Sequence, residues 1–225
     1  MRETGFREFI LHVLEQHFTL VQEDLGADAV LSKGGMTFTT EGWKIDGIGH
    51  LCFMRMRGFF GLMRMETAVI SPTHVDAPLF NADWVKVLGN ETQIVEMYDT
   101  QLQPLPAECG RVFEVLRERD ADIPDVPSKG ERWYDSILYP FSYHKKGKGI
   151  EDRLSTAAQD YLVSYVDQLA GMAACDEREK AAKVRAFATR LFDEGGPAVD
   201  QVVKLFGRTV GQRLIVRHMY GADGV

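Results

Sequence analysis

The sequence predicts an α+β fold, an α/β/α sandwich in which helices flank a central antiparallel sheet. An amphipathic segment opens the chain, β-prone runs fill residues 36 to 102, and helical patterns take over after Pro106. Because the two kinds of element are segregated rather than alternating, parallel βαβ units are not expected. The chain has 225 residues and no linker-like stretch, so we expect a single domain over residues 1–225.

The first element is expected to be a helix that ends near Gly26. Hydrophobic residues recur there at three- and four-residue steps, the spacing of one face of an amphipathic helix. The residues that set this pattern are Phe6, Phe9, Ile10, Val13, Leu14, His17 and Val21.

Six β-prone runs follow and predict a meandering antiparallel sheet. Gly, Pro and Asn separate the runs, and these residues interrupt strands and favour turns. Gly89-Asn90, between two of the runs, is a signal for a tight hairpin. The runs cover residues 36–40, 43–48, 51–56, 62–70, 80–88 and 92–99.

The second half of the chain is predicted to be mainly helical. Apolar spacing indicates helices over 107–119 and 154–169 and around 184–191, the last stopped by Gly195-Gly-Pro197. Two short helices are expected to follow, up to about Tyr220. Residues 121–130 read as a loop, and residues 132–149 are dense in aromatic side chains, which either pack onto the sheet or line a flat ligand.

Composition limits the function. With 45% hydrophobic and 26% charged residues and a net charge of −7, the chain is not expected to cover nucleic acid. No run of 18 apolar residues predicts a membrane span, and residues 1–22 lack the pattern of a signal peptide. We therefore expect a cytoplasmic protein without a membrane partner, and a monomer by default.

Cysteine and glycine patterns argue against a built-in redox group. Cys52, Cys109 and Cys175 form no Cys-x-x-Cys pair, so neither a metal site nor an iron–sulfur cluster is predicted. No strand is followed by Gly-x-Gly-x-x-Gly, so no nicotinamide or flavin site is predicted either. If the protein performs redox chemistry, its electrons are expected to come from another molecule.

Two acidic residues, Glu66 and Asp83, lie in neighbouring apolar runs. The segment 71–78 between them contains two prolines and reads as a loop, so the two strands are expected to pair antiparallel and to project both acids onto one face. An acid in an apolar strand is costly to bury unless it is paired or protonated, which makes each a candidate proton donor. The alternative is that both face solvent.

The same stretch resembles the ferredoxin-dependent bilin reductases. The resemblance rests on an acid at position 66, an Asp76-Ala-Pro78 loop, Asp83 on the next strand and the sequence Asp99-Thr-Gln-Leu-Gln-Pro-Leu105. The segment 195–207, with Pro-Ala before a helix ending in Phe-Gly, looks like the family's closing helices. The resemblance extends patchily from about residue 50 to the C-terminus. The order and spacing of the matching motifs agree with the family.

The resemblance implies an open-chain tetrapyrrole such as biliverdin as substrate, held between the sheet and the C-terminal helices. Electrons would come singly from reduced ferredoxin, with no cofactor bound to the protein. Asp83 would protonate the bilin and Glu66 would relay the proton. Further substrate-binding candidates are Arg55, Arg64, His74 and Asp193, and Arg57 is considered with the other two arginines for the substrate's propionates.

Departures from the family pattern leave three hypotheses. Glu66 stands where many of these reductases have His or Asn and resembles the related red chlorophyll catabolite reductases. Gly196 stands where an acid is expected before Pro-Ala, and Asp193 and Glu194 are the candidates to replace that acid. The chain is thus expected to be a bilin reductase, a reductase of a chlorophyll or haem catabolite, or a tetrapyrrole carrier. A basic patch for ferredoxin is sought among Lys145, Lys146, Lys148, Arg153, Arg208, Arg213 and Arg217.

Overall fold

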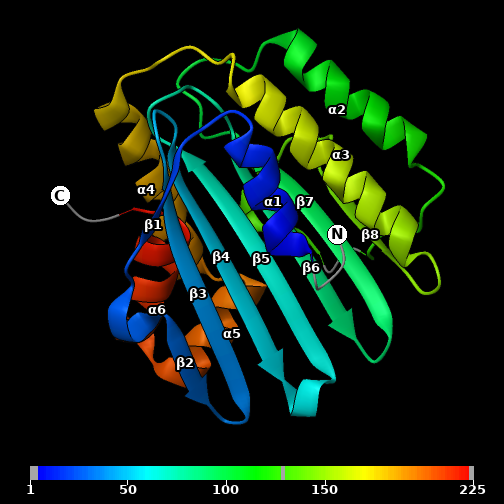
Figure 1. Ribbon diagram of the computed structural model, residues 1–225, viewed down its shortest axis with the longest axis vertical. Coiled ribbons are helices and arrows are strands. Elements are labelled where there is room, and N and C mark those ends of the chain that lie inside the picture. The colour runs from blue at the N-terminus through cyan, green and yellow to red at the C-terminus, as the bar shows by residue number, and fades with distance from the viewer. Residues whose placement is uncertain (1–4, 128–129, 223–225) are drawn as a thin grey trace.

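One antiparallel sheet organises the chain (Figure 1). The computed structural model describes residues 5–127 and 130–222. Strands lie side by side in the order β1-β3-β4-β5-β6-β7-β8, and β2 also pairs with β3. The strands are β1 (Leu20–Glu23), β2 (Val30–Lys33), β3 (Met36–Ile45), β4 (Gly49–Gly58), β5 (Met63–Pro72), β6 (Leu79–Val87), β7 (Asn90–Tyr98) and β8 (Tyr143–Gly147).

Helices cover both faces of the sheet, as Figure 1 shows. The face that we call the α1–α3 face packs on α1 (Phe6–Glu15), α2 (Ala107–Arg119) and α3 (Glu151–Leu169). The opposite face, the α4–η4 face, packs on α4 (Glu177–Glu194), α5 (Pro197–Phe206), α6 (Arg208–Gln212) and the π-helical segment η4 (Arg213–Met219). The described residues also form three short 3-10 segments: η1 (Gly26–Asp28), η2 (Phe59–Gly61) and η3 (Trp133–Ile137). The predicted α/β/α sandwich is confirmed.

Alternation along each strand divides the core into two layers. On β5, Ala68 and Ile70 contribute to the core under α1 and α3, whereas Val69 between them contributes to the core under α4 and η4. On β6, Phe80 faces the first layer and Leu79 the second. Since side chains alternate with a period of two, these apolar residues fix the face of every polar residue between them.

Several elements begin or end at other residues than predicted. The first helix ends at Glu15, and Val21, which the prediction placed in that helix, lies in β1. The runs 36–40 and 43–48 form a single strand through Gly42, where a Cβ would come within 3.1 Å of Leu25 Cδ2. The hairpin turn is Leu88-Gly89 rather than Gly89-Asn90, with both residues at positive φ. Strands β1, β2 and β8 were not predicted. The predicted loop 121–130 includes residues 128–129, which lie outside the described residues.

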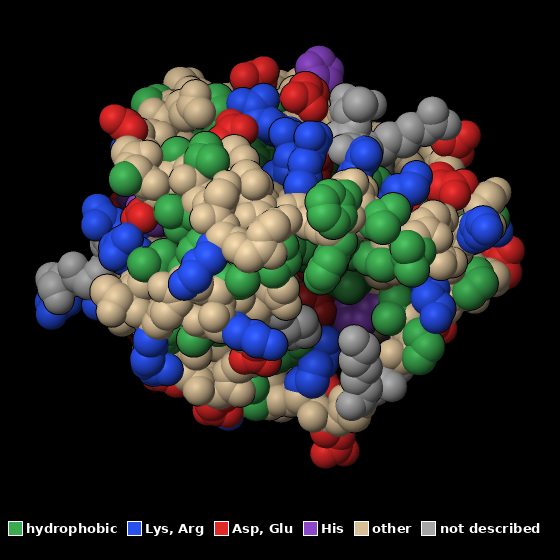
Figure 2. Space-filling model, turned by 90° about the horizontal axis from the view of Figure 1, so that it is seen from below, with side chains coloured by type: hydrophobic (Ala, Val, Ile, Leu, Met, Phe, Trp, Pro, Cys, Tyr) green, Lys and Arg blue, Asp and Glu red, His purple; other side chains and the backbone are tan. Residues whose placement is uncertain are grey.

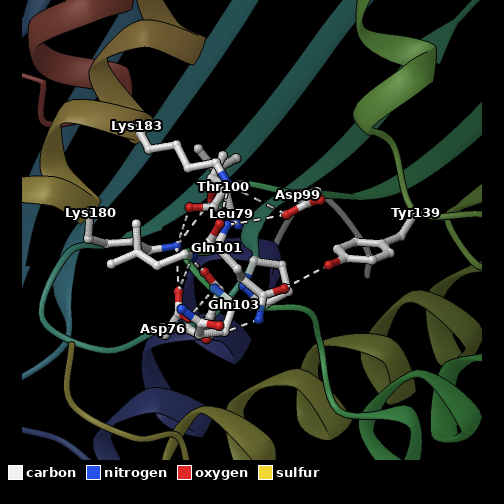
Figure 3. A network of polar contacts seen from close by, with 12 residues as sticks. Asp76, Leu79, Asp99, Thr100, Gln101, Gln103, Tyr139, Lys180 and Lys183 are labelled. Carbon is white, nitrogen blue, oxygen red and sulfur yellow. Dashed lines mark hydrogen bonds and ion pairs between the residues drawn. The ribbon is translucent and has the colours of Figure 1, made fainter. Parts of the chain in front are cut away.

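The loop before β6 is held by a buried polar network (Figure 3). The Asp76 carboxylate accepts hydrogen bonds from the backbone N–H groups of Leu102 (2.7 Å) and Gln103 (2.8 Å). Lys180, fully buried on α4, donates to the carbonyl oxygens of Ala77 (2.6 Å) and Thr100 (2.7 Å). The two segments that carried much of the family resemblance therefore bind each other, and Lys180 ties α4 to both.

We expect Asp76→Ala to lower the free energy of unfolding by about 2–3 kcal/mol, because it removes two charge-assisted hydrogen bonds and the nearest carboxylate to Lys180. The matched control is Asp99→Ala in the same network, where the half-exposed carboxylate accepts one long hydrogen bond. Urea unfolding of both variants measures the difference. Equal losses would contradict a special role for Asp76.

Candidate functional site

Asp83 lies in the middle of β6. It is four residues after Leu79, and since side chains alternate along a strand, both project onto the α4–η4 face. Its carboxylate accepts hydrogen bonds from the hydroxyl of Thr67 on β5 (2.5 Å) and from the side-chain amide of Asn81 (3.0 Å). Burial raises the pKa of Asp83 to about 6, helped by the charge of Glu96 and opposed by the two hydrogen bonds. Near neutral pH this carboxyl group can both release and take up a proton.

A second acid, Glu96, accompanies Asp83 on the same face. The strand register places Glu96 of β7 opposite Asn81, two positions along the sheet from the level of Asp83. Its carboxylate accepts a hydrogen bond from the Tyr98 hydroxyl (2.5 Å) and lies 2.9 Å from Nε2 of His144 on β8. Glu96 is thus a buried acid that is paired with a base and a phenol.

Two aromatic residues and a cation from other segments approach this acid pair. Arg132, just before η3, lies 3.8 Å from Glu96 and donates a hydrogen bond to the Tyr134 hydroxyl (3.0 Å). Tyr220, which follows η4 directly, is buried with its ring 5.5 Å from that of Phe187. Burial and the charges of Asp83 and Glu96 raise the pKa of the Tyr220 phenol, so it remains a proton donor at any ordinary pH.

The surface is hollowed at the lower end of the sheet. Figure 2, seen from this end, shows a recess near the centre of the view with acidic and histidine side chains at its floor and hydrophobic side chains at its rim. A recess with an apolar rim and a few convergent polar groups is the usual character of a small-molecule site. We refer to Asp83, Glu96, Arg132, His144 and Tyr220 as the sheet cluster.

The expected pairing of Glu66 with Asp83 is wrong. The register places Thr67, not Glu66, opposite Asp83, and Glu66 opposite Trp84. Glu66 therefore projects onto the α1–α3 face, where it is buried and forms an ion pair with Arg55 at 2.8 Å. The loop 71–78 brings the two strands together as predicted, but its length sets a register that separates the acids.

The arginines proposed to hold the substrate are also on the other face. The register of β4 and β5 places Arg55 opposite Glu66 and Arg57 opposite Arg64. The side chains of the three arginines therefore project onto the same face as Glu66. Arg64 donates a hydrogen bond to the carbonyl oxygen of Gly61 at the end of the sheet (3.2 Å). All three therefore project from the face opposite to Asp83, whereas Arg132 lies 3.8 Å from Glu96 of the sheet cluster.

His74 and Asp193 do not join the site either. His74, in the loop before β6, forms an ion pair with Glu177 at 2.7 Å. Asp193 is half-exposed on α4 and binds Arg208, while Glu194 binds Arg190. The acid missing at Gly196 is therefore not replaced by either neighbour.

The remaining members of the sheet cluster were missed at the sequence level. Glu96 gave the same signal as Asp83, an acid within the apolar run 94–98, but no motif singled it out. His144 and Arg132 lie in the aromatic segment, whose pairing with β7 could not be recognised from local pattern. Tyr220 follows Asp83 by more than 130 positions, and only the folding of η4 against the sheet brings them together.

Within residues 5–127 and 130–222, no group of three or more His, Cys, Asp or Glu is arranged to hold a metal ion. None of the helices in the same ranges combines the length and hydrophobicity that a membrane span requires.

Comparison with known proteins identifies the fold. No protein-family model and no curated protein match the sequence. Among solved structures, the chain is similar to the crystal structure of phytochromobilin synthase from tomato in complex with biliverdin, with a TM-score of 0.73. The two share 13% sequence identity, and the match covers 96% of this chain and 83% of the tomato chain. The resemblance seen in the motifs is thus confirmed at the level of the fold.

The raised pKa of Asp83 predicts a characteristic dependence of stability on pH. Its pKa of about 6 in the folded protein lies above the 3.8 of an unperturbed carboxyl, so between these values the folded state binds more protons and stability falls as pH rises. Asp83→Asn removes this loss. The advantage of the variant in free energy of unfolding should therefore be about 2 kcal/mol larger at pH 7.5 than at pH 4.5. An advantage that does not change with pH would contradict the raised pKa.

Neighbouring charges should move the pKa of Asp83 in opposite directions. Glu96→Gln removes a negative charge and is expected to lower that pKa, whereas His144→Gln removes a potential positive charge and is expected to raise it. Carbon NMR titration of the Asp83 carboxyl group in the two variants measures both shifts. Absence of both shifts would show that burial alone sets the pKa, and shifts of the same sign would contradict the assigned effects of the two charges.

Proposed function

We propose that this protein is a ferredoxin-dependent bilin reductase that reduces biliverdin to a phytobilin such as phycocyanobilin. The observation that carries the proposal is Asp83, an acid with a pKa near 6 on the α4–η4 face of a fold shared with a biliverdin-bound synthase. The bilin would lie between the sheet and the C-terminal helices. No cofactor of the protein's own is part of this proposal.

The chemistry assigned to Asp83 is proton donation to the bound bilin. A protonated bilin carries positive charge and accepts an electron more readily than a neutral one. Each reduced double bond takes up two protons and two electrons, and the electrons arrive one at a time from reduced ferredoxin through a substrate radical. Because the pKa of Asp83 is near the working pH, the carboxyl can be reprotonated between steps.

The rest of the sheet cluster supports binding and proton supply. His144 and Glu96, 2.9 Å apart, can exchange a proton beside Asp83. Arg132 is the cation suited to a substrate propionate at this face, because a guanidinium binds a carboxylate through two parallel hydrogen bonds. In this proposal it takes the role first expected of Arg55 and Arg64.

A tetrapyrrole carrier on the same scaffold is the second candidate. It is favoured by Gly196 and by the outward ion pairs of Asp193 and Glu194, which leave the tail without the acid expected there. A reductase of a chlorophyll or haem catabolite was suggested by Glu66. It stays an alternative on that residue identity, although Glu66 lies on the α1–α3 face and not beside Asp83.

Biliverdin titration and anaerobic turnover distinguish these candidates. The purified protein should sharpen and red-shift the biliverdin absorption band, and a ferredoxin reducing system should then convert the pigment. Asp83→Asn is expected to bind biliverdin within about threefold of the native protein and to lose at least about a hundredfold in reduction rate. Glu66→Gln is the matched control, and we expect it to retain both binding and turnover.

Each other outcome has a defined meaning. Binding without conversion by the native protein would favour the carrier, and no binding would exclude both bilin functions. Full activity of Asp83→Asn, or loss of turnover in Glu66→Gln alone, would remove Asp83 from the mechanism.

A further inference from the structure

Two neighbouring turns at the lower end of the sheet expose large hydrophobic side chains. Phe59 is 60% exposed and Phe60 fully exposed in the β4–β5 turn, and Leu88 is 71% exposed in the β6–β7 turn. The turns form one surface, because the Leu88 N–H donates a hydrogen bond to the Leu62 carbonyl (3.3 Å). We call this surface the apolar tip; its members are Phe59, Phe60, Leu62, Val87 and Leu88.

The backbone at the apolar tip is unfavourable for the residues that occupy it. Phe59, Phe60 and Leu88 have φ values of 50°, 56° and 48°, and in the described part of the chain they are the non-glycine residues with positive φ. Large side chains at such positions are rare and cost stability. Since these side chains bury little surface within the fold, packing offsets little of this cost.

A row of cations crosses the sheet beside the apolar tip. Arg57, Arg64 and Lys86 are direct cross-strand partners on β4, β5 and β6, so three positive charges stand side by side. Like charges in this arrangement repel. We call these residues the basic row, and Figure 2 shows basic side chains gathered next to exposed hydrophobic ones at this end.

The basic residues first considered for docking are largely committed to contacts within the fold. Lys145 is buried and pairs with Asp125, and Arg153 binds Asp122. Arg208 and Arg213 form ion pairs with Asp193 and Asp28, respectively. The basic row adjoins the exposed apolar side chains of the apolar tip, and this combination of charge and apolar area makes it the stronger docking surface.

We propose that the apolar tip and the basic row form the docking surface for a small, acidic iron–sulfur electron carrier. The proposal rests on the function proposed above, which requires such a donor. An apolar centre flanked by arginines is typical of the core and rim of protein interfaces, and the row attracts an acidic partner. The recess opens at the same end of the molecule, so a donor docked here would stand close to a pigment bound in it (Figure 2).

Direct binding of a plant-type [2Fe–2S] ferredoxin tests the surface without turnover. We expect Arg64→Glu to weaken ferredoxin binding about tenfold in calorimetric titrations at low salt and to reduce its salt dependence. Phe60→Gly should weaken binding about tenfold while leaving Tm unchanged or raised, because glycine accepts φ 56°. A purely structural role for Phe60 predicts a lower Tm instead. Matched controls are Arg178→Glu and Val115→Ala, both exposed and remote from the surface.

Turnover assays separate docking from the proposed reaction. With ferredoxin as donor, the two test variants should raise KM for ferredoxin about tenfold at unchanged kcat, while their biliverdin affinity stays native. If native protein binds ferredoxin but reduces no bilin, the proposed function fails and the docking surface stands on the titrations.

Absence of ferredoxin binding, or test variants that bind like the controls, would overturn the surface. Binding to anionic phospholipid vesicles that Phe60→Gly abolishes, without ferredoxin binding, would assign it to a membrane instead.

Discussion

The register between β5 and β6 is the constraint on which the rest of this structure depends. Thr67 opposite Asp83 decides that Asp83 faces the C-terminal helices and that Glu66 faces the N-terminal ones. A shift of one residue would exchange the two faces and bury every polar group of β6 in the wrong layer. The register is fixed by apolar residues on both sides and by the Asp76 network, which holds the loop that leads into β6.

Two buried polar networks in this fold use similar residues for different purposes. Around Asp76 the carboxylate accepts two backbone N–H groups and Lys180 donates to two carbonyl oxygens, so charged groups are matched by strong hydrogen bonds and the segment is fixed. Around Asp83 the hydrogen bonds come from neutral donors, and a second acid lies on the same face. Burial therefore raises the pKa of Asp83, which is the property required of a proton donor.

The C-terminal segment packs over the face of the sheet that carries Asp83. Asp28 near the sheet edge binds Arg213 and His218 of η4, and these contacts hold the pKa of Asp28 well below its ordinary value. They anchor the π-helical segment that ends immediately before Tyr220. π-Helical turns are frequent at functional sites. The layer over Asp83 thus combines the sheet with a helical cover that is tied to Asp28.

The amino-acid pattern alone determined the fold class and one member of the site. Segregated β and helical patterns predicted the α/β/α sandwich, and an acid within an apolar strand identified Asp83. Tertiary structure alone decided which side chains accompany it. The face of Glu66 was predicted wrongly because two strands joined by a loop can pair in more than one register. A register that differs by one residue turns a side chain to the other face, and the sequence pattern does not fix that register. Glu96, His144 and Tyr220 reach Asp83 through pairing and packing over long sequence separations, which local periodicity cannot encode.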